Sequence, residues 1–180
     1  VKVQHASELI RQQSISEIVL TLNNTTLSYG KGLGVYLQSD SKLEAYNLTG
    51  SIKDRAVYFM VDMLEQSGVL KKGDVLVEAT SGNTGIALSM IGNLKGYKVI
   101  IVMPDNMSIE RQNLMKAYNA EIILTDGNLG MEGSINVMNN LLNENINYKS
   151  LNQFENEYNT LAHYKTTGFE IYNQVKDIDI

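Results

Sequence analysis

The stretch DVLVEATSGNTGIALSMIGNLKGYKVIIVMP, residues 74–104, decides the fold of this chain of 180 residues. Its first part, DVLVEA, and its last part, KVIIVM at residues 98–103, are short apolar runs bounded by turn residues, so both are predicted strands. Between them, residues 84–94 are apolar, have the length of a helix and end at Lys95 and Gly96. The order strand, helix, strand with short connections predicts two parallel strands joined by a helical crossover.

The same alternation extends this unit in both directions. Before it, apolar residues recur at helical spacing from Ser51, the expected cap, to Gly68. This pattern predicts the α/β class, a parallel sheet with helices on both faces in a three-layer αβα arrangement. Ligands of such sheets bind beyond the carboxyl ends of the strands, where helices begin. The remaining predicted elements are a helix from Ser108, a strand at 121–125, a helix at 130–142, a strand at 148–151 and a helix at 161–175.

Composition excludes several classes of function. Hydrophobic residues make up 43% and charged residues 19% of the chain, which allows a real core and argues against disorder. The absence of Cys excludes a disulfide scaffold and a cysteine nucleophile, and two distant histidines, His5 and His163, predict no metal site. A net charge of −5 argues against nucleic acid, and no apolar run is long enough for a membrane span. Without a recognisable leader, we expect a cytoplasmic protein.

Residues 49–55 (TGSIKDR) place Lys53 in the first turn of a predicted helix. The positive end of the helix dipole lies there and disfavours an ammonium group, so lysine is an unusual choice. An amine with a lowered pKa suits Schiff-base chemistry with a carbonyl compound. The alternative is a solvated surface lysine next to an acid–base pair, Asp54 and Arg55.

Residues 80–85 (TSGNTG) lie directly between a predicted strand and a predicted helix. They offer consecutive backbone amides at a helix start and several short polar side chains, an arrangement that binds a carboxylate or a phosphate. No lysine of the Walker type follows, which excludes a nucleotide P-loop. The alternative is an ordinary turn in which a Ser or Thr caps the helix.

Other segments are less informative. Polar residues at 153–156 (QFEN) and 163–168 (HYKTTG) follow a predicted strand end, but periodicity does not separate a site from a loop there. The glycines at 30–34 lack the spacing of a dinucleotide fingerprint and indicate a flexible turn. Residues 35–37 suggest a strand, and residues 16–22 fit either a strand or a short helix.

Taken in order, these motifs resemble the cysteine synthase and cystathionine β-synthase family, whose members are pyridoxal phosphate (PLP) enzymes with the fold of the tryptophan synthase β-subunit. Residues 49–55, preceded by 42–44 (KLE), resemble the Schiff-base lysine motif of the family, and residues 80–85 resemble its substrate loop. Ordered agreement over residues 42–173 is far more specific than any single motif. Further matching positions are Met103-Pro104, Met107-Ser108, Glu110-Arg111, 153–156 and 166–168.

The resemblance implies that Lys53 holds PLP as a Schiff base and later carries the α-proton of the substrate, and that Asn83 hydrogen-bonds the 3′-oxygen of the cofactor. The implied reaction is β-replacement: O-acetylserine, serine or cysteine loses its β-substituent to give an aminoacrylate, to which sulfide or a thiol adds. Cysteine desulfhydration and the synthesis of cystathionine or lanthionine share these motifs. The residues implied to hold the α-carboxylate are Thr80, Ser81, Gly82, Thr84 and Gln153.

The chain is shorter than typical members of this family, whose loop for the cofactor phosphate lies in their second half. We expect residues 46–150 to form the smaller αβα lobe with the substrate loop. Residues 1–45 and 151–180 are expected to contribute to a larger lobe that is incomplete here. The chain is either a fragment of a full-length, homodimeric enzyme or a short paralogue that has lost catalysis and acts as a binding or regulatory module. Lys53 and the intact loop at 80–85 favour the first explanation.

Overall fold

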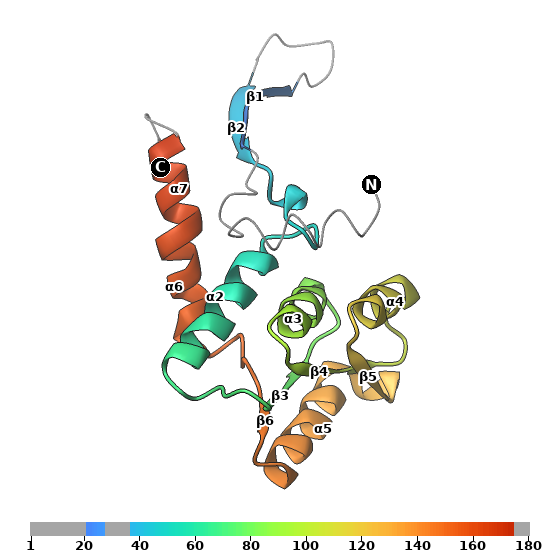
Figure 1. Cartoon of the computed structure of the whole chain (residues 1–180). Helices are drawn as coiled ribbons and strands as arrows, with labels where there is room; N and C mark the ends of the chain where they lie inside the picture. Colours follow the sequence, from blue (N-terminus) through green and yellow to red (C-terminus); the bar gives the residue numbers. More distant parts are fainter. Residues whose placement is uncertain (1–20, 28–36, 175–180) are drawn as a thin grey trace.

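A four-stranded parallel sheet lies at the centre of the computed structural model, which describes residues 21–27 and 37–174 (Figure 1). The strands lie side by side in the order β5, β4, β3, β6, and every neighbouring pair is parallel. Their bounds are Val75–Ala79 for β3, Lys98–Pro104 for β4, Glu121–Thr125 for β5 and Tyr148–Lys149 for β6. The central pair predicted from residues 74–104 is therefore confirmed, as is the α/β class.

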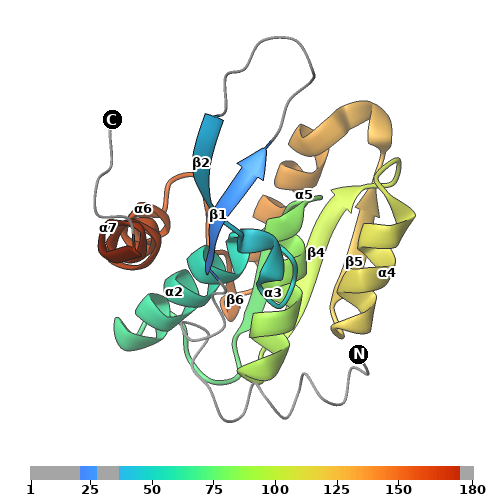
Figure 2. The same cartoon turned by 90° about the horizontal axis from the view of Figure 1, so that it is seen from above.

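Helices cover both faces of this sheet, and the alternation of strand side chains explains how. Leu76 of β3 and Ile101 of β4 pack toward α2, α3 and α4, whereas Val77 and Ile100, their chain neighbours, pack toward α5. Figure 2 shows α5 on the side of the sheet opposite to α3. Because both faces are buried, the strands read as continuous apolar runs. The helices are α2 Lys53–Gln66, α3 Asn83–Leu94, α4 Ile109–Ala117 and α5 Gly130–Glu144.

The last predicted helix differs from the observed one. It begins at Glu157, before the predicted start at residue 161, because the Asn156 side chain accepts a hydrogen bond from the N–H of Tyr158 and so caps the helix. It is also divided into three consecutive segments: α6 Glu157–His163, the π-helical turn η4 Tyr164–Gly168 and α7 Phe169–Gln174. The prediction therefore missed both the cap and the π-helical turn.

The described part before α2 consists of an antiparallel pair of strands, β1 Thr21–Leu27 and β2 Leu37–Lys42, followed by the short helix η2 Glu44–Tyr46. The predicted strand at 35–37 and the strand or short helix predicted at 16–22 fall only partly within the described residues, and the glycine turn at 30–34 falls outside them. The division of the chain at residues 46 and 150 remains a prediction. None of the helices described is long and apolar enough to cross a membrane.

Candidate functional site

Residues 80–85 connect β3 to α3 at the carboxyl end of the strand. Gly82 is the N-cap of α3, and within the described residues no side chain caps this helix. By contrast, the side chains of Ser108 and Asn156 cap α4 and α6. The uncapped start leaves backbone N–H groups and the positive end of the helix dipole available to an anion. The Ser or Thr cap that the alternative assumed is therefore not formed, and anion binding by the loop stays a prediction.

The structure brings Gln153 to this loop from 69 residues further along the chain. The Thr84 hydroxyl donates a hydrogen bond of 2.6 Å to Oε1 of Gln153, and both side chains are buried. Thr80 is buried as well, whereas Asn83 is exposed at the first position of α3. The residues predicted to hold a carboxylate are thus gathered at one helix start, with Ser81 and Gly82 half-buried between them.

Close packing at Gly85 shapes the inner side of the loop. A Cβ atom at this position would lie 2.8 Å from Cε of Met115 and 2.9 Å from Cγ2 of Thr80, so a larger residue would have to displace the Met115 side-chain end and the Thr80 methyl group. On the outer side, Nη1 of Arg111 donates a hydrogen bond of 3.3 Å to the Ser81 carbonyl oxygen. The loop therefore has a tightly packed interior and an exposed cation beside it.

Lys53 is the first residue of α2, as the sequence predicted. Its backbone N–H donates a hydrogen bond of 3.2 Å to the Ser51 hydroxyl, although the helix itself has Ile52 as its N-cap. The side chain is half-buried, and its ammonium group has no hydrogen-bond or ion-pair partner among the residues that the structure describes. A primary amine thus stands at the start of a second helix, which packs against α3.

Asp54 and Arg55 do not form the acid–base pair that the alternative for Lys53 assumed. Asp54 is fully buried, and its carboxylate accepts a hydrogen bond of 2.8 Å from the N–H of Thr49. Burial outweighs this bonding and raises the pKa of Asp54. Arg55 is also buried and binds two glutamates, Glu44 and Glu170. The two residues that follow Lys53 are therefore buried and bind different partners: Asp54 binds Thr49, and Arg55 binds the two glutamates.

His163 of α6 lies near enough to Lys53 for the two charges to interact. Burial, followed by the positive charge of Lys53, lowers the pKa of His163, and its Nδ1 lies 3.2 Å from the Thr167 hydroxyl. No hydrogen bond or ion pair joins Lys53 to residues 80–85 in the described part of the chain. Lys53 and the loop at 80–85 are connected through the packing of α2 against α3.

Glu78 belongs to the surroundings of the loop, and sequence reasoning missed it. Its carboxylate is buried at the end of β3 and accepts hydrogen bonds from the Ser150 hydroxyl, at 2.7 Å, and from the N–H of Leu151, at 3.0 Å. We call Glu78 with residues 150–153 the Glu78 turn. The available signal was a second acidic residue within the predicted strand DVLVEA, beyond Asp74 at its first position, since acidic residues are depleted in strands.

A second polar group, which we call the Arg55 cluster, comprises the buried Arg55 and three half-buried partners, Lys42, Glu44 and Glu170. The Arg55 guanidinium lies 2.8 Å from Glu44 and binds Glu170 through two hydrogen bonds of 2.8 and 2.9 Å. Nζ of Lys42 lies 2.7 Å from Glu170. Burial raises the pKa of Glu170, but the bonds from Arg55 and Lys42 outweigh it, so the pKa lies below the usual range. The cluster ties β2 and η2 to α2 and α7.

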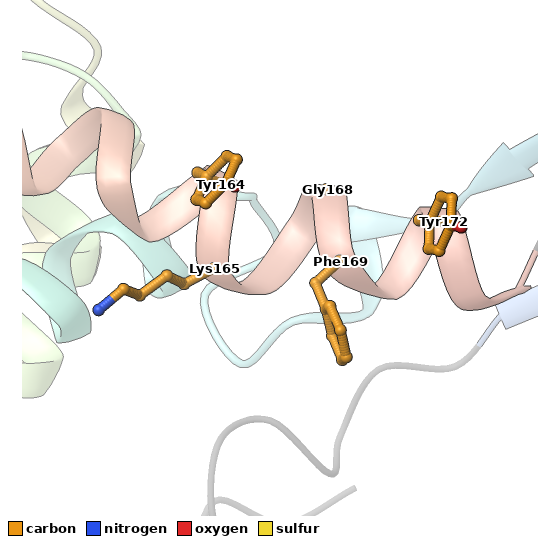
Figure 3. Close-up of a pocket in the computed structure, with 5 residues that line it drawn as sticks. All are labelled: Tyr164, Lys165, Gly168, Phe169 and Tyr172. Carbon is orange, nitrogen blue, oxygen red and sulfur yellow. The ribbon is translucent and has the colours of Figure 1, made fainter.

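A pocket of about 580 Å³ lies elsewhere, along η4 and α7. Figure 3 shows Tyr164 and Tyr172 on one side of this helical segment and Phe169 on the other. All three rings are exposed. The pocket is therefore an open surface, and none of the predicted site residues lines it. Its lining residues are Tyr164, Lys165, Gly168, Phe169 and Tyr172.

Comparison with known proteins places the chain among PLP enzymes. A family model described as "Pyridoxal-phosphate dependent enzyme" matches residues 23–180. Cysteine synthase B of Escherichia coli (strain K12) is 48% identical over 162 residues, which cover 89% of this chain and 53% of that protein. A probable cysteine synthase of Bacillus subtilis (strain 168) is 50% identical over 137 residues, covering 76% of this chain and 44% of that protein. The chain thus spans about half the length of the curated relatives it matches.

Solved structures share the fold. A cysteine synthase from Entamoeba histolytica has a TM-score of 0.78 at 39% identity, covering 91% of this chain and 50% of that chain. A hydrogen sulfide-producing enzyme from Fusobacterium nucleatum has a TM-score of 0.79 at 38% identity, covering 97% of this chain and 51% of that chain. These findings confirm the resemblance to cysteine synthases that the sequence motifs indicated. Since the family model matches most of its residues, the chain belongs to the family of pyridoxal-phosphate dependent enzymes.

Proposed function

We propose that the full-length protein containing this chain catalyses a β-replacement of the cysteine synthase type. A small amino acid such as O-acetylserine, serine or cysteine exchanges its β-substituent for sulfide or a thiol. The observation that carries the proposal is the uncapped start of α3, where the buried hydrogen bond between Thr84 and Gln153 lies beside free backbone N–H groups. This is a receptor for a carboxylate, the group that every such substrate carries.

The chemistry of the available donors fits PLP. Lys53 offers a primary amine for the aldehyde of the cofactor, and Asn83 offers an exposed carboxamide for its ring oxygen. A Cβ atom at Gly82 would meet no atom within 4 Å, so the space in front of the loop is open. When bound, PLP supplies the electron sink that stabilises negative charge at the α-carbon. We assign no phosphate-binding residue within the described part of the chain.

We assign separate tasks to the two helix starts. At α3, the Thr80 hydroxyl, the N–H of Ser81 and the NH₂ group of Gln153 donate to the α-carboxylate, the Thr84 hydroxyl holds Gln153 in place, and Gly82 leaves room for the ligand. Holding this group fixes the α-carbon relative to Lys53 and removes rotational freedom before the reaction. At α2, Nζ of Lys53 accepts the α-proton and returns it. The Arg111 guanidinium near Ser81 adds positive potential that attracts an anionic substrate.

A second candidate is the release of hydrogen sulfide from cysteine. It is favoured by the likeness to hydrogen sulfide-producing enzymes of Fusobacterium nucleatum, one structure of which is 44% identical over 79% of this chain. Both reactions begin with the loss of a β-substituent and differ in whether a thiol is consumed or released. Measuring cysteine formed from O-acetylserine and sulfide, against sulfide formed from cysteine, separates them.

The experiment that tests the proposal is the visible absorbance of the full-length protein after addition of PLP. A covalent bond between Lys53 and the cofactor gives a visible band, which Lys53→Ala should abolish. The matched control is Lys72→Ala, an exposed lysine before β3, which should keep the band. A parent protein that stays colourless would overturn the proposal in favour of a non-catalytic binding or regulatory module. The accompanying proposal of a cytoplasmic homodimer, drawn from the family resemblance, is tested by sedimentation and by cell fractionation.

A further inference from the structure

Glu78 is a charged residue in an otherwise apolar strand, and the residue is only 3% exposed. Because strand side chains alternate, Glu78 shares a face with Leu76, on the side of the sheet that α2 and α3 cover. Removing a carboxylate from water is costly, and burial accordingly raises the pKa of Glu78. A carboxylate is accommodated at such a place only when hydrogen-bond donors surround it.

The donors all come from one short segment, the turn at residues 150–153. The Ser150 hydroxyl and the N–H of Leu151 bind Oε2 of Glu78 at 2.7 and 3.0 Å. The backbone N–H groups of Asn152 and Gln153 also act to lower the pKa of this carboxylate, although the N–H of Asn152 donates its own hydrogen bond, of 3.0 Å, to the Ser150 hydroxyl. One side chain at the end of β3 thus gathers the N–H groups of the turn that precedes α6.

The carbonyl groups of the same turn are held from the other side. Nδ2 of Asn156 donates to the Leu151 carbonyl at 2.7 Å, and Nδ2 of Asn159 donates to the Gln153 carbonyl at 2.8 Å. Asn152 adopts a φ of +47°, a conformation that non-glycine residues rarely take. The turn therefore has one defined geometry, and it directs the Gln153 side chain onto Thr84.

We propose that Glu78 is a positioning residue, which fixes the turn at 150–153 so that Gln153 meets Thr84 and completes the receptor for the substrate α-carboxylate. The identity of the ligand rests on the proposed function, whereas the fixing of the turn does not. Glu78 touches the turn and acts on the substrate only through Gln153.

A carboxylate is required because every group facing it is a donor. An ionised glutamate accepts hydrogen bonds on both oxygens, whereas a glutamine presents an NH₂ group on one side. In Glu78→Gln, an oxygen in the place of Oε2 can keep the bonds from Ser150 and Leu151, but the NH₂ group then replaces the second acceptor oxygen, and the negative charge that strengthens these bonds is lost. The conservative change should therefore loosen the turn while it preserves the size of the side chain.

The test uses the full-length protein and its Glu78→Gln variant. Hydrogen exchange of the amides at 151–153 should accelerate about tenfold, the factor for one lost hydrogen bond to a charged group, while β4 is unchanged. Binding to the PLP-loaded protein is then compared for L-serine and for ethanolamine, which is serine without its α-carboxylate. Serine should bind about tenfold more weakly to the variant, and ethanolamine less than twofold more weakly.

Controls separate positioning from general destabilisation. Glu144→Gln, an exposed glutamate at the end of α5, should change none of these values. If Glu78→Gln does not fold, Ser150→Ala removes one donor and should shift exchange and serine binding in the same direction by a smaller factor. Unchanged exchange at 151–153, or an equal loss of serine and ethanolamine binding, overturns the proposal. A parent protein that binds neither compound defeats the proposed function, and the exchange measurement alone then decides the positioning role.

Discussion

The Glu78 turn and the Arg55 cluster offset the cost of removing a carboxylate from water in different ways: Glu78 is buried, and Glu170 is half-buried beside the buried Arg55. Glu78 is surrounded by neutral donors, and burial leaves its pKa raised. Glu170 is bound by Arg55 and Lys42, and its pKa is lowered even though burial alone would raise it. Dipoles satisfy the first carboxylate, and opposite charges compensate the second.

The difference indicates what each group contributes. The bonds of Glu78 reach one turn and define the position of Gln153, which lies at the candidate carboxylate receptor. The hydrogen bond between Arg55 and Glu170 joins α2 to α7, two helices whose bonded residues are 115 positions apart in the chain. We therefore expect changes in the Arg55 cluster to lower stability, and changes in the Glu78 turn to impair substrate binding more than stability.

The largest expected effect is that of Arg55→Met, which leaves Glu44 and Glu170 without their shared partner. Loss of the buried arginine of this ion-pair cluster should lower the free energy of unfolding by up to about 3 kcal/mol, the lower end for a fully buried pair. Chemical denaturation of the full-length protein measures it. Combining Arg55→Met with Glu170→Gln should recover part of the loss, because one unpaired charge is removed as well. Strictly additive losses would show that the two residues are not coupled.

The next largest effect is expected for Thr84→Val, which removes the donor to Gln153 with little change in shape. An unsatisfied buried acceptor costs about 1–2 kcal/mol, and serine binding should weaken alongside. Thr84→Ser, which keeps the hydroxyl, should retain binding near that of the parent. If Thr84→Val lowered stability but left serine binding unchanged, the bond would be structural, and the contrast between the two groups would fail.

A smaller effect is expected for Lys42→Met at the edge of the Arg55 cluster. Lys42 binds a carboxylate that Arg55 already holds with two hydrogen bonds. Its removal should lower the free energy of unfolding by about 0.5 kcal/mol, as is typical of a partly exposed ion pair. High salt should diminish this difference between parent and variant in denaturation measurements. A loss as large as that of Arg55→Met would mean that Lys42 anchors the cluster.

The smallest expected effect is on the pH dependence of the free energy of unfolding, which should have opposite signs for the Glu170 and Glu78 carboxylates. The pKa of Glu170 is lowered on folding, so its contribution is present above the unfolded-state pKa and is lost as pH falls through the folded-state value. The pKa of Glu78 is raised, so its contribution is full below the unfolded-state pKa and is lost as pH rises through the folded-state value. On acidification, the free energy of unfolding of the parent should therefore fall relative to that of Glu170→Gln. Relative to that of Glu78→Gln, it should rise. Denaturation at a series of pH values measures both, and gaps that moved together would contradict the contrast.

Local signals explain which elements were predictable. The strands around residues 75–79 and 98–104 are bounded apolar runs, and their limits follow from side-chain pattern and turn residues. The start of α6 was misplaced because its cap, Asn156, stands among other polar residues with no apolar periodicity to frame it. The π-helical turn that follows has no period of its own in the sequence.

The sequence by itself determined the alternation of strands and helices, the loop of small and polar residues at 80–85 and the placement of Lys53 at the start of a helix. These features depend on backbone preferences and periodicities that act over a few residues. Only the tertiary structure decided that Gln153 reaches Thr84, that Glu78 collects the N–H groups of a distant turn, and that Arg55 binds Glu170 rather than Asp54. Such partners are set by how the crossovers return the chain to the sheet, and no local pattern encodes which polar side chains then meet.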